Sequence, residues 1–213
     1  AGMTGKLLVP EAIRAGIVDK LERLATRPTL PGTPAAAAIA ESLEYVWACS
    51  AFAADACLRD EGLLEWLATQ GRLLEPADAA WYAQTADAVT LPGSHDDAVF
   101  MSALRIFRRR QLVRIAWRDL AGYAPIEQVL AELSWLADAC INVACRQAAA
   151  LLGARHGVPK DRNGVELPLL VLGMGKLGGG ELNFSSDIDL VFLYPDGARL
   201  EAASVEAETY YQR

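Results

Sequence analysis

A cluster of glycines between two short apolar runs restricts the fold of this chain more than any other feature. Residues 167–172 and 188–194 are rich in Leu, Val, Ile and aromatic side chains, and both are shorter than typical helices. Short apolar runs bounded by glycine and proline are typical of buried strands, so a strand is expected at each position. The glycines between them predict a tight turn followed by a short polar segment.

An Asp-Ile-Asp sequence opens the second apolar run. Side chains two residues apart in a strand point to the same face, so Asp187 and Asp189 are expected side by side, with Ile188 directed into the core. Two adjacent carboxylates repel each other unless a cation lies between them. Because Mg²⁺ binds one or two carboxylates together with substrate phosphates, we predict that Asp187 and Asp189 are metal ligands and catalytic residues for phosphoryl or nucleotidyl transfer.

The glycine cluster is predicted to bind phosphates. Glycine lets backbone amides approach phosphate oxygens without interference from a side chain, and a lysine within the cluster adds a positive charge. The candidate residues are Gly175, Lys176, Gly178 and Gly179.

Two other glycine patterns compete with this interpretation. Gly173, Gly175 and Gly178 match the dinucleotide fingerprint GxGxxG after a strand. That fold needs a crossover helix of about 10 or more residues before the next parallel strand, and residues 179–186 leave room for only about two turns. A Walker A loop is excluded because the lysine is followed by Leu177 rather than Ser or Thr. A solvated strand end after a loose glycine turn remains the purely structural alternative.

The residues before about 160 follow a helical pattern. Alanine, leucine and glutamate dominate long stretches, which prolines, glycines and capping residues divide. Asp60 and Ser94 are expected to cap helices, and Pro76 and Pro125 to open them. We expect a loop at 27–34 and helices at 35–59, 60–70, 76–89, 96–120, 125–155 and 201–213.

The expected fold is mainly α. A helical bundle over residues 1–160 is followed, over residues 161–213, by the beginning of an α/β domain. Two strands do not make a stable sheet with both faces covered. The sheet is therefore expected to be incomplete, or the chain to be a fragment of a longer protein.

Composition limits the partners and the compartment. The net charge is −7, and binding to nucleic acid draws its energy from Lys and Arg, so no nucleic-acid partner is expected. No signal peptide is visible and no apolar stretch approaches the roughly 20 residues of a membrane span, so a cytoplasmic protein without membrane contact is expected. The cysteines form no CxxC pair and are expected to be buried, reduced thiols: Cys49, Cys57, Cys140 and Cys145.

Arginines crowd the segment 105–118. Arg110, Arg114 and Arg118 recur every four residues and share one face of the expected helix. That face either meets a phosphate group or an acidic partner surface, or is solvated and pairs with nearby Asp and Glu residues.

Residues 173–194 read GMGKLGGGELNFSSDIDLVFLY, and this run resembles the signature of the glutamine synthetase adenylyltransferases. These bifunctional enzymes attach AMP to a tyrosine of glutamine synthetase and remove it. Residues 104–120 resemble the helix that precedes the site in that family. The resemblance implies a polymerase-beta-like nucleotidyltransferase domain that uses Mg²⁺, with ATP, ADP and inorganic phosphate as substrates or products. It also implies glutamine synthetase as the partner protein, with the PII signalling protein as a further candidate.

The resemblance assigns roles to individual residues. Asp187 and Asp189 would hold Mg²⁺ while inorganic phosphate attacks the AMP phosphorus, the tyrosine oxygen leaves and ADP is released. Ser186 would either position a phosphate or only orient the loop. The residues that would position the phosphates, with Lys176 assisting, are Gly178, Gly179 and Ser186.

The amino-acid sequence of residues 179–189 is more similar to the N-terminal, adenylyl-removing half of the family than to the C-terminal, adenylyl-adding half. Addition of AMP from ATP stays an alternative, as does a docking module for glutamine synthetase or PII without chemistry of its own. The wider superfamily uses a third carboxylate on a later strand, and nothing after Asp189 fits that role. The chain by itself is therefore expected to turn over little or nothing.

Overall fold

The computed structural model describes residues 9–89, 97–200 and 206–212, and it confirms a mainly α fold with a small sheet near its C-terminal end. The helices are α1 (Glu11–Arg14), a 3₁₀ turn η1 (Ala15–Ile17), α2 (Val18–Ala25), α3 (Pro34–Cys49), α4 (Ala51–Arg59), α5 (Leu63–Thr69), α6 (Ala79–Asp87), α7 (Asp97–Leu120), α8 (Ile126–His156), α9 (Gly175–Gly178) and α10 (Ala207–Tyr211). The strands are β1 (Leu170–Gly173) and β2 (Leu190–Leu193).

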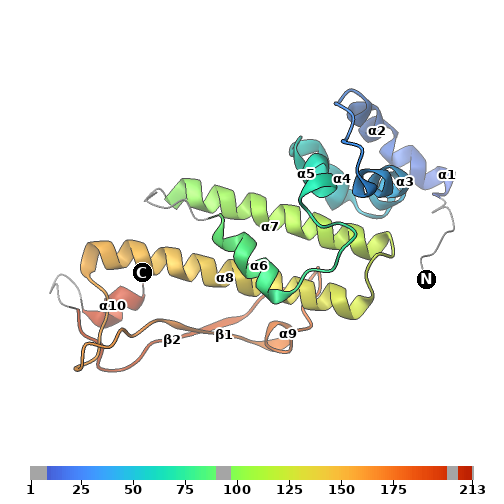
Figure 1. Ribbon diagram of the computed structural model, residues 1–213. Coiled ribbons are helices and arrows are strands. Elements are labelled where there is room, and N and C mark those ends of the chain that lie inside the picture. Colours follow the sequence, from blue (N-terminus) through green and yellow to red (C-terminus); the bar gives the residue numbers. More distant parts are fainter. Residues whose placement is uncertain (1–8, 90–96, 201–205, 213) are drawn as a thin grey trace.

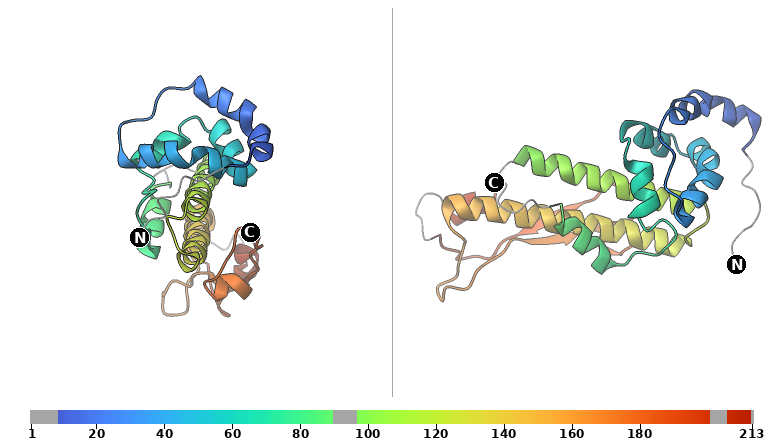
Figure 2. Two further views of the ribbon diagram at one scale, coloured as in Figure 1. Left: turned by 90° about the vertical axis from the view of Figure 1, so that its right-hand side faces the viewer. Right: turned by 45° about the horizontal axis from the view of Figure 1, so that its top comes forward.

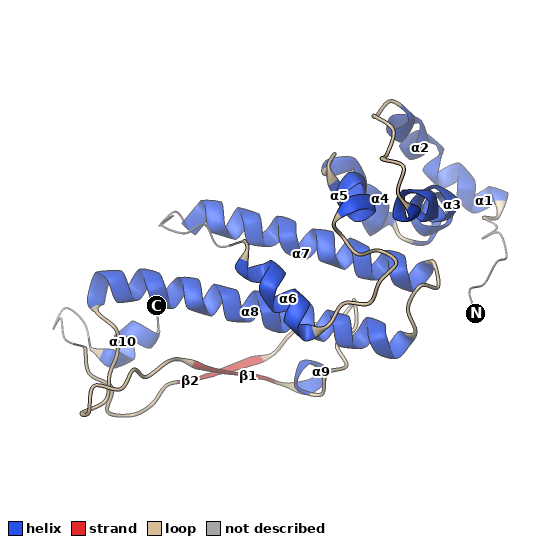
Figure 3. Cartoon of the chain, in the orientation of Figure 1, coloured by secondary structure: helices blue, strands red, loops and turns tan. Residues whose placement is uncertain are grey.

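The long helices α7 and α8 lie antiparallel and form the middle of the molecule (Figure 1). The helices α1 to α5 pack against one end of α7, and the strands run along the side of α8 that faces away from α7 (Figures 1 and 2). Figure 3 shows how small the β component is beside the helices. The order of layers is therefore small helices, α7, α8 and sheet.

Two hydrophobic clusters fill the spaces between these layers. The first lies among η1, α3, α4, α5 and one face of α7, and it includes the buried side chains of Trp47 and Trp117. The second lies among α6, α8 and another face of α7, and it includes Leu177 and Leu182 from the glycine-rich segment. The second cluster therefore ties that segment to α8.

The helix starts differ in detail from the sequence prediction. The expected helix 35–59 is two helices, because Ser50 takes an extended conformation and its side chain accepts a hydrogen bond from the Ala53 amide. Asp60 does not cap α5, which begins after Gly62. Asp78, rather than Pro76, opens α6 by accepting the Trp81 amide at 2.8 Å.

The other boundaries agree more closely. Pro125 precedes α8, and Gly157 ends it with a φ of 83°, a conformation that favours glycine. The expected cap Ser94 lies outside the described residues. The expected helix 201–213 is represented by α10 within the described part of that range.

The strands are shorter and more exposed than predicted. They pair antiparallel, with Leu170 opposite Leu193 and Leu172 opposite Val191. These four side chains share the face turned away from α8 and are 40–52% exposed, so the expectation of buried strands was wrong. The physical reason is that a two-stranded sheet leaves one face to solvent, and even on the face toward α8 Phe192 is 55% exposed and lines a pocket.

The cysteines are only partly as expected. All four are free thiols, but only Cys57 is buried, whereas Cys49 is exposed and the other two are half-buried. Burial raises the pKa of Cys57 to about 12 and that of Cys140 to about 11, which makes both thiols poor nucleophiles. Of the helices within the described ranges, none has the length and apolar character of a membrane span.

Candidate functional site

The glycine-rich turn follows β1 directly and depends on glycine at three positions. Gly175 and Gly180 have φ angles of 55° and 69°, which side-chain-bearing residues rarely adopt. At Gly178 an added Cβ would lie 2.5 Å from the carbonyl oxygen of Gly173, so the chain could not pass there with any other residue. The glycines are therefore needed for the backbone to turn this tightly. This requirement explains the glycine pattern independently of any phosphate binding.

The predicted phosphate-binding residues surround this turn and are accessible. Gly175, Lys176, Gly178 and Gly179 are all exposed. The amides of Gly178 and Gly179 donate to the carbonyls of Met174 and Gly175, at 3.3 and 3.0 Å. A phosphate could reach these two amides only if the turn opened, whereas the Lys176 side chain is accessible as it stands.

A second, tighter turn leads from the glycines to the aspartates. The Asn183 carbonyl accepts the Ser186 amide at 3.2 Å, and the Asn183 side-chain oxygen accepts the hydroxyl groups of Ser185 and Ser186. Ser186 therefore orients the loop, which was one of its two predicted roles. The other role, contact with a phosphate, stays a prediction.

The two aspartates lie in the extended segment just before β2. The amide of Met174 donates to the Asp189 carbonyl at 2.9 Å, so the pairing of β1 and β2 continues for one further residue. Asp187 and Asp189 are both exposed. Ile188 is 42% exposed, and the prediction that it points into the core was wrong because it lines a cavity next to α7 and α8 instead of packing closely against them.

This donor set is compatible with Mg²⁺. Two exposed carboxylates can supply two oxygen ligands and leave further positions for water and substrate phosphates, as Mg²⁺ usually requires. Within the described residues, no group of three or more His, Cys, Asp or Glu side chains could hold a metal ion. The sequence-based prediction of these two ligands therefore stays a prediction.

A cavity of about 710 Å³ lies beside the aspartates, between α7, α8, the start of α4 and the loop 182–188. Of the predicted site residues, Ser186 and Asp187 line it, whereas Asp189 and the glycine turn do not. Apolar side chains from α7 and α8 make much of the wall, including Leu112, Leu133, Leu136 and Ile141. A molecule bound at Asp187 could extend into this space.

The cavity also has polar residues that the sequence analysis did not single out as site residues. Arg108, Asp119 and Asn183 line it, and burial raises the pKa of Asp119. The only sequence signal for Asn183 is its position three residues before Ser186, a spacing typical of a side chain that closes a turn. Arg108 and Asp119 belong to α7 and reach the cavity because α7 forms part of its wall.

The arginine face of α7 is neither solvated nor open to a phosphate. Arg114 and Arg118 are 0% and 1% exposed and pair with Glu132 of α8, which is 1% exposed. The Tyr82 hydroxyl donates to the same carboxylate at 2.9 Å. Burial raises the pKa of Tyr82 well above its ordinary value. The third arginine of the face, Arg110, donates twice to Asp60. The expected pairing with Asp and Glu is therefore confirmed, whereas the expected solvation of the face was wrong for Arg114 and Arg118.

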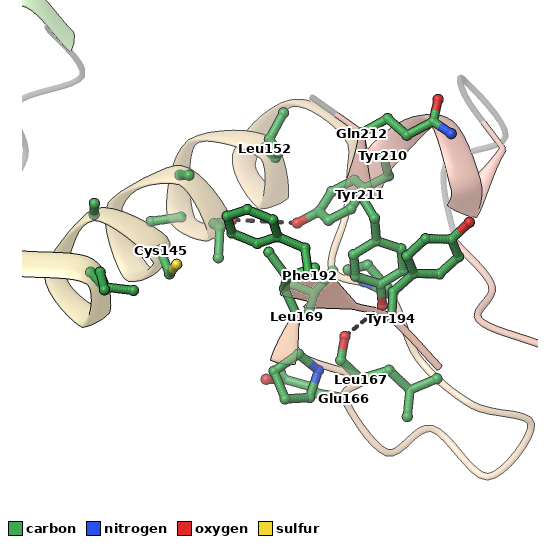
Figure 4. Close-up of a pocket in the computed structure, with 18 of the residues that line it drawn as sticks. Cys145, Leu152, Glu166, Leu167, Leu169, Phe192, Tyr194, Tyr210, Tyr211 and Gln212 are labelled. Carbon is green, nitrogen blue, oxygen red and sulfur yellow. Dashed lines mark hydrogen bonds between the residues drawn. The ribbon is translucent and has the colours of Figure 1, made fainter. Parts of the chain in front are cut away.

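A larger pocket of about 1190 Å³ lies between the C-terminal half of α8 and the sheet (Figure 4). Tyr194 and Tyr211 stack there with ring centroids 5.0 Å apart, and the Tyr211 hydroxyl donates to the Leu167 carbonyl at 2.6 Å. The lining is mostly apolar and includes none of the predicted site residues. This pocket therefore contains none of the predicted ligands, although it shares Ile141 with the wall of the smaller cavity.

Comparison with known proteins gives one consistent family. Residues 40–213 match the family model described as glutamate-ammonia ligase adenylyltransferase. The chain is 42% identical over 187 residues to the bifunctional glutamine synthetase adenylyltransferase/adenylyl-removing enzyme of Thioalkalivibrio sulfidiphilus (strain HL-EbGR7), an alignment covering 88% of this chain and 19% of the relative.

Two proteins of the same name show similar agreement. The one from Nitrosococcus oceani is 40% identical over 179 residues, covering 81% of this chain and 18% of the relative. The one from Shewanella loihica is 48% identical over 106 residues, covering 50% of this chain and 11% of the relative. The chain thus spans about a fifth or less of the length of these relatives. The matched range contains the glycine turn, both aspartates and the helices that support them, and the chain belongs to the glutamate-ammonia ligase adenylyltransferase family.

Proposed function

We propose that this chain carries the metal-binding and phosphate-binding loop of the adenylyl-removing half of a bifunctional enzyme that modifies glutamine synthetase. The observation that carries the proposal is the position of Asp187. It is exposed, it follows a turn closed by Asn183 and Ser186, and it lines a cavity large enough for a nucleotide. Asp189 stands two residues further on and is exposed as well.

The proposed reaction is phosphorolysis of adenylylated tyrosine. A bond forms between an oxygen of inorganic phosphate and the AMP phosphorus, the bond from that phosphorus to the tyrosine oxygen breaks, and the tyrosine oxygen takes up a proton to give ADP and free tyrosine. Asp187 and Asp189 would hold Mg²⁺, which neutralises charge on the transferred group. Lys176 adds a positive charge, and Asn183 keeps Ser186 and Asp187 in place.

The preference for removal over addition rests on a resemblance: the amino-acid sequence of residues 179–189 is more similar to the adenylyl-removing half of the family than to the adding half. The names of the relatives include both activities. Transfer of AMP from ATP is therefore the second candidate function. Glutamine synthetase is the proposed partner in either case, PII is a further candidate, and the cytoplasm is the proposed compartment.

The test is made in the full-length protein to which this chain belongs. Asp187→Asn should lower Mg²⁺-dependent and phosphate-dependent release of ADP from adenylylated glutamine synthetase by more than about 100-fold, because removing one preorganised charge-stabilising group commonly costs that much. Transfer of AMP from ATP should persist. Asp196→Asn is the matched control, since Asp196 is exposed in a turn just after β2.

The alternatives give different results. Loss of AMP transfer with ADP release intact would assign this chain to the adding half. Binding of glutamine synthetase or PII that survives Asp187→Asn, with both activities unchanged, would favour a docking module. Binding of NAD without metal would instead support the dinucleotide fingerprint.

A further inference from the structure

The backbone of the segment that carries Asp187 donates a hydrogen bond to a buried hydroxyl group of α8. We propose that Ser134 is a positioning residue, which sets the place of Asp187 by holding the backbone of Leu182. The consequence for activity rests on the proposed function, whereas the consequence for the loop does not.

The hydrogen bonds of Ser134 give its hydroxyl a fixed direction. Ser134 is 3% exposed, and its hydroxyl donates to the Leu130 carbonyl one turn earlier in α8 at 2.9 Å. Because the proton is used within the helix, a lone pair of the oxygen faces outward. That lone pair accepts the amide of Leu182 at 3.0 Å, in a buried contact between residues 48 positions apart in the sequence.

The held residue is close to the aspartates along the chain. Leu182 is followed directly by the turn in which Asn183 holds Ser186, and Asp187 comes next. The Leu182 side chain also packs into the second hydrophobic cluster. Apolar contacts are not directional, so packing alone keeps the loop near α8, whereas the hydrogen bond fixes which residue lies opposite Ser134.

The other side of the hydrogen bond is equally well fixed. Glu132 lies two residues before Ser134 on α8 and is held by the buried side chains of Arg114, Arg118 and Tyr82. Ser134 therefore stands on a part of α8 that α6 and α7 hold in place. A change at Ser134 should move the loop rather than the helix.

The chain offers a matched control in Ser42. Ser42 is 1% exposed, donates to the Ala38 carbonyl one turn earlier in α3 at 2.6 Å, and accepts Trp117 Nε1 at 2.8 Å. It has the same chemistry as Ser134, but its partner Trp117 belongs to the first hydrophobic cluster. Removing either hydroxyl leaves one buried N–H group without its partner, so the two variants should lose similar stability.

The experiment compares Ser134→Ala, Ser134→Thr and Ser42→Ala in the full-length protein. We expect Ser134→Ala to speed amide hydrogen exchange at residues 182–187 and to raise the Mg²⁺ concentration for half-maximal ADP release by about 10-fold, the scale on which supporting groups affect metal sites. Ser134→Thr keeps the hydroxyl and should restore both values most of the way. Ser42→Ala should lower the melting temperature without changing either readout.

Two results would overturn the proposal. One is Ser134→Ala with unchanged exchange at residues 182–187 and unchanged Mg²⁺ dependence. The other is an equal change of both in Ser42→Ala, which would show general destabilisation instead of positioning. If the wild-type protein releases no ADP, the proposed function fails, and amide exchange at residues 182–187 alone then supports or overturns the role of Ser134.

Discussion

Asp60 shows how one side chain can be predicted to matter and yet be given the wrong role. It follows α4, and its carboxylate accepts two hydrogen bonds from the Arg110 guanidinium, at 2.7 and 2.9 Å. That paired arrangement is the strong form of an ion pair. The hydrogen bonds from Arg110 are the main reason that the pKa of Asp60 is lowered, while partial burial opposes them. Asp60 therefore joins α4 to α7 instead of capping α5.

The lowered pKa of Asp60 predicts a specific pH dependence of stability. The folded protein favours the ionised carboxylate, so the stabilisation is present above the unfolded pKa of about 3.9 and is lost as pH falls through the lower, folded value. Asp60→Asn should reduce the free energy of unfolding by about 1.5–3 kcal/mol at neutral pH. Urea unfolding should show the gap between wild type and variant closing below about pH 4.

A double-mutant cycle with Arg110→Ala provides the control. In that background Asp60→Asn should cost much less, because its main partner is already gone. An unchanged cost would mean that Asp60 acts through other contacts, and the pH dependence would then need another origin.

At the scale of elements, Glu132 is the point where α6, α7 and α8 are joined. Its carboxylate accepts hydrogen bonds from the Arg114 side chain of α7 and the Tyr82 hydroxyl of α6. The amide of Ala77, in the loop before α6, also donates to it at 3.4 Å. Arg118 lies 3.7 Å away at its Nε atom. Burial and the neighbouring Arg114 charge lower the pKa of Arg118, as expected when two cations share one buried anion.

Neutralising this anion should therefore be costly. Glu132→Gln leaves two buried guanidinium groups without a compensating charge, and we expect a loss of about 3–5 kcal/mol in the free energy of unfolding, the usual result of removing one partner of a buried ion pair. Glu41→Gln, at an exposed position of α3, should change it by less than about 0.5 kcal/mol. A Glu132→Gln protein as stable as the control would show that the cluster is not a structural joint.

The elements also show what the sequence could and could not predict. The long, periodic segments of α7 and α8 and the two apolar runs indicated the correct element types. The break at Ser50 was missed because the apolar pattern continues across it, and only the local hydrogen bond from the Ala53 amide marks the new start. The burial of Arg114 was missed because four-residue spacing shows which side chains share a face, but not what covers that face.

The candidate site likewise has features that could be predicted from the sequence and contacts that could not. Asp187, Asp189 and the glycines are neighbours in the sequence, so their pattern was readable. The contact of Ser134 with Leu182, and the presence of Arg108 and Asp187 in the lining of one cavity, involve residues far apart in the chain. Such contacts depend on how α7 and α8 pack, which local sequence does not determine.

At the scale of the whole molecule, α7 belongs to both hydrophobic clusters. Val113 and Trp117 pack in the first cluster, whereas Phe100 and Ile115 pack in the second. Arg114 and Arg118 also donate to the backbone carbonyls of Gly71 and Leu73, in the loop that leads from α5 toward α6. Both clusters depend on side chains of α7 for part of their packing. We therefore expect the helices around both clusters to unfold together.

This sharing predicts one cooperative transition for the helical part of the protein. Trp117→Ala removes a side chain with 0% exposure from the first cluster and should lower the free energy of unfolding by about 3–5 kcal/mol. In hydrogen exchange under mild denaturant, amides near Val46 in the first cluster and near Val143 in the second should lose protection by the same amount, although only the first is close to the substitution. Ile115→Ala, in the second cluster, should likewise lower the protection of amides in both clusters. If Trp117→Ala weakened protection near Val46 and left Val143 unchanged, the clusters would be separate folding units, and α7 would be a contact surface between them instead of their common support.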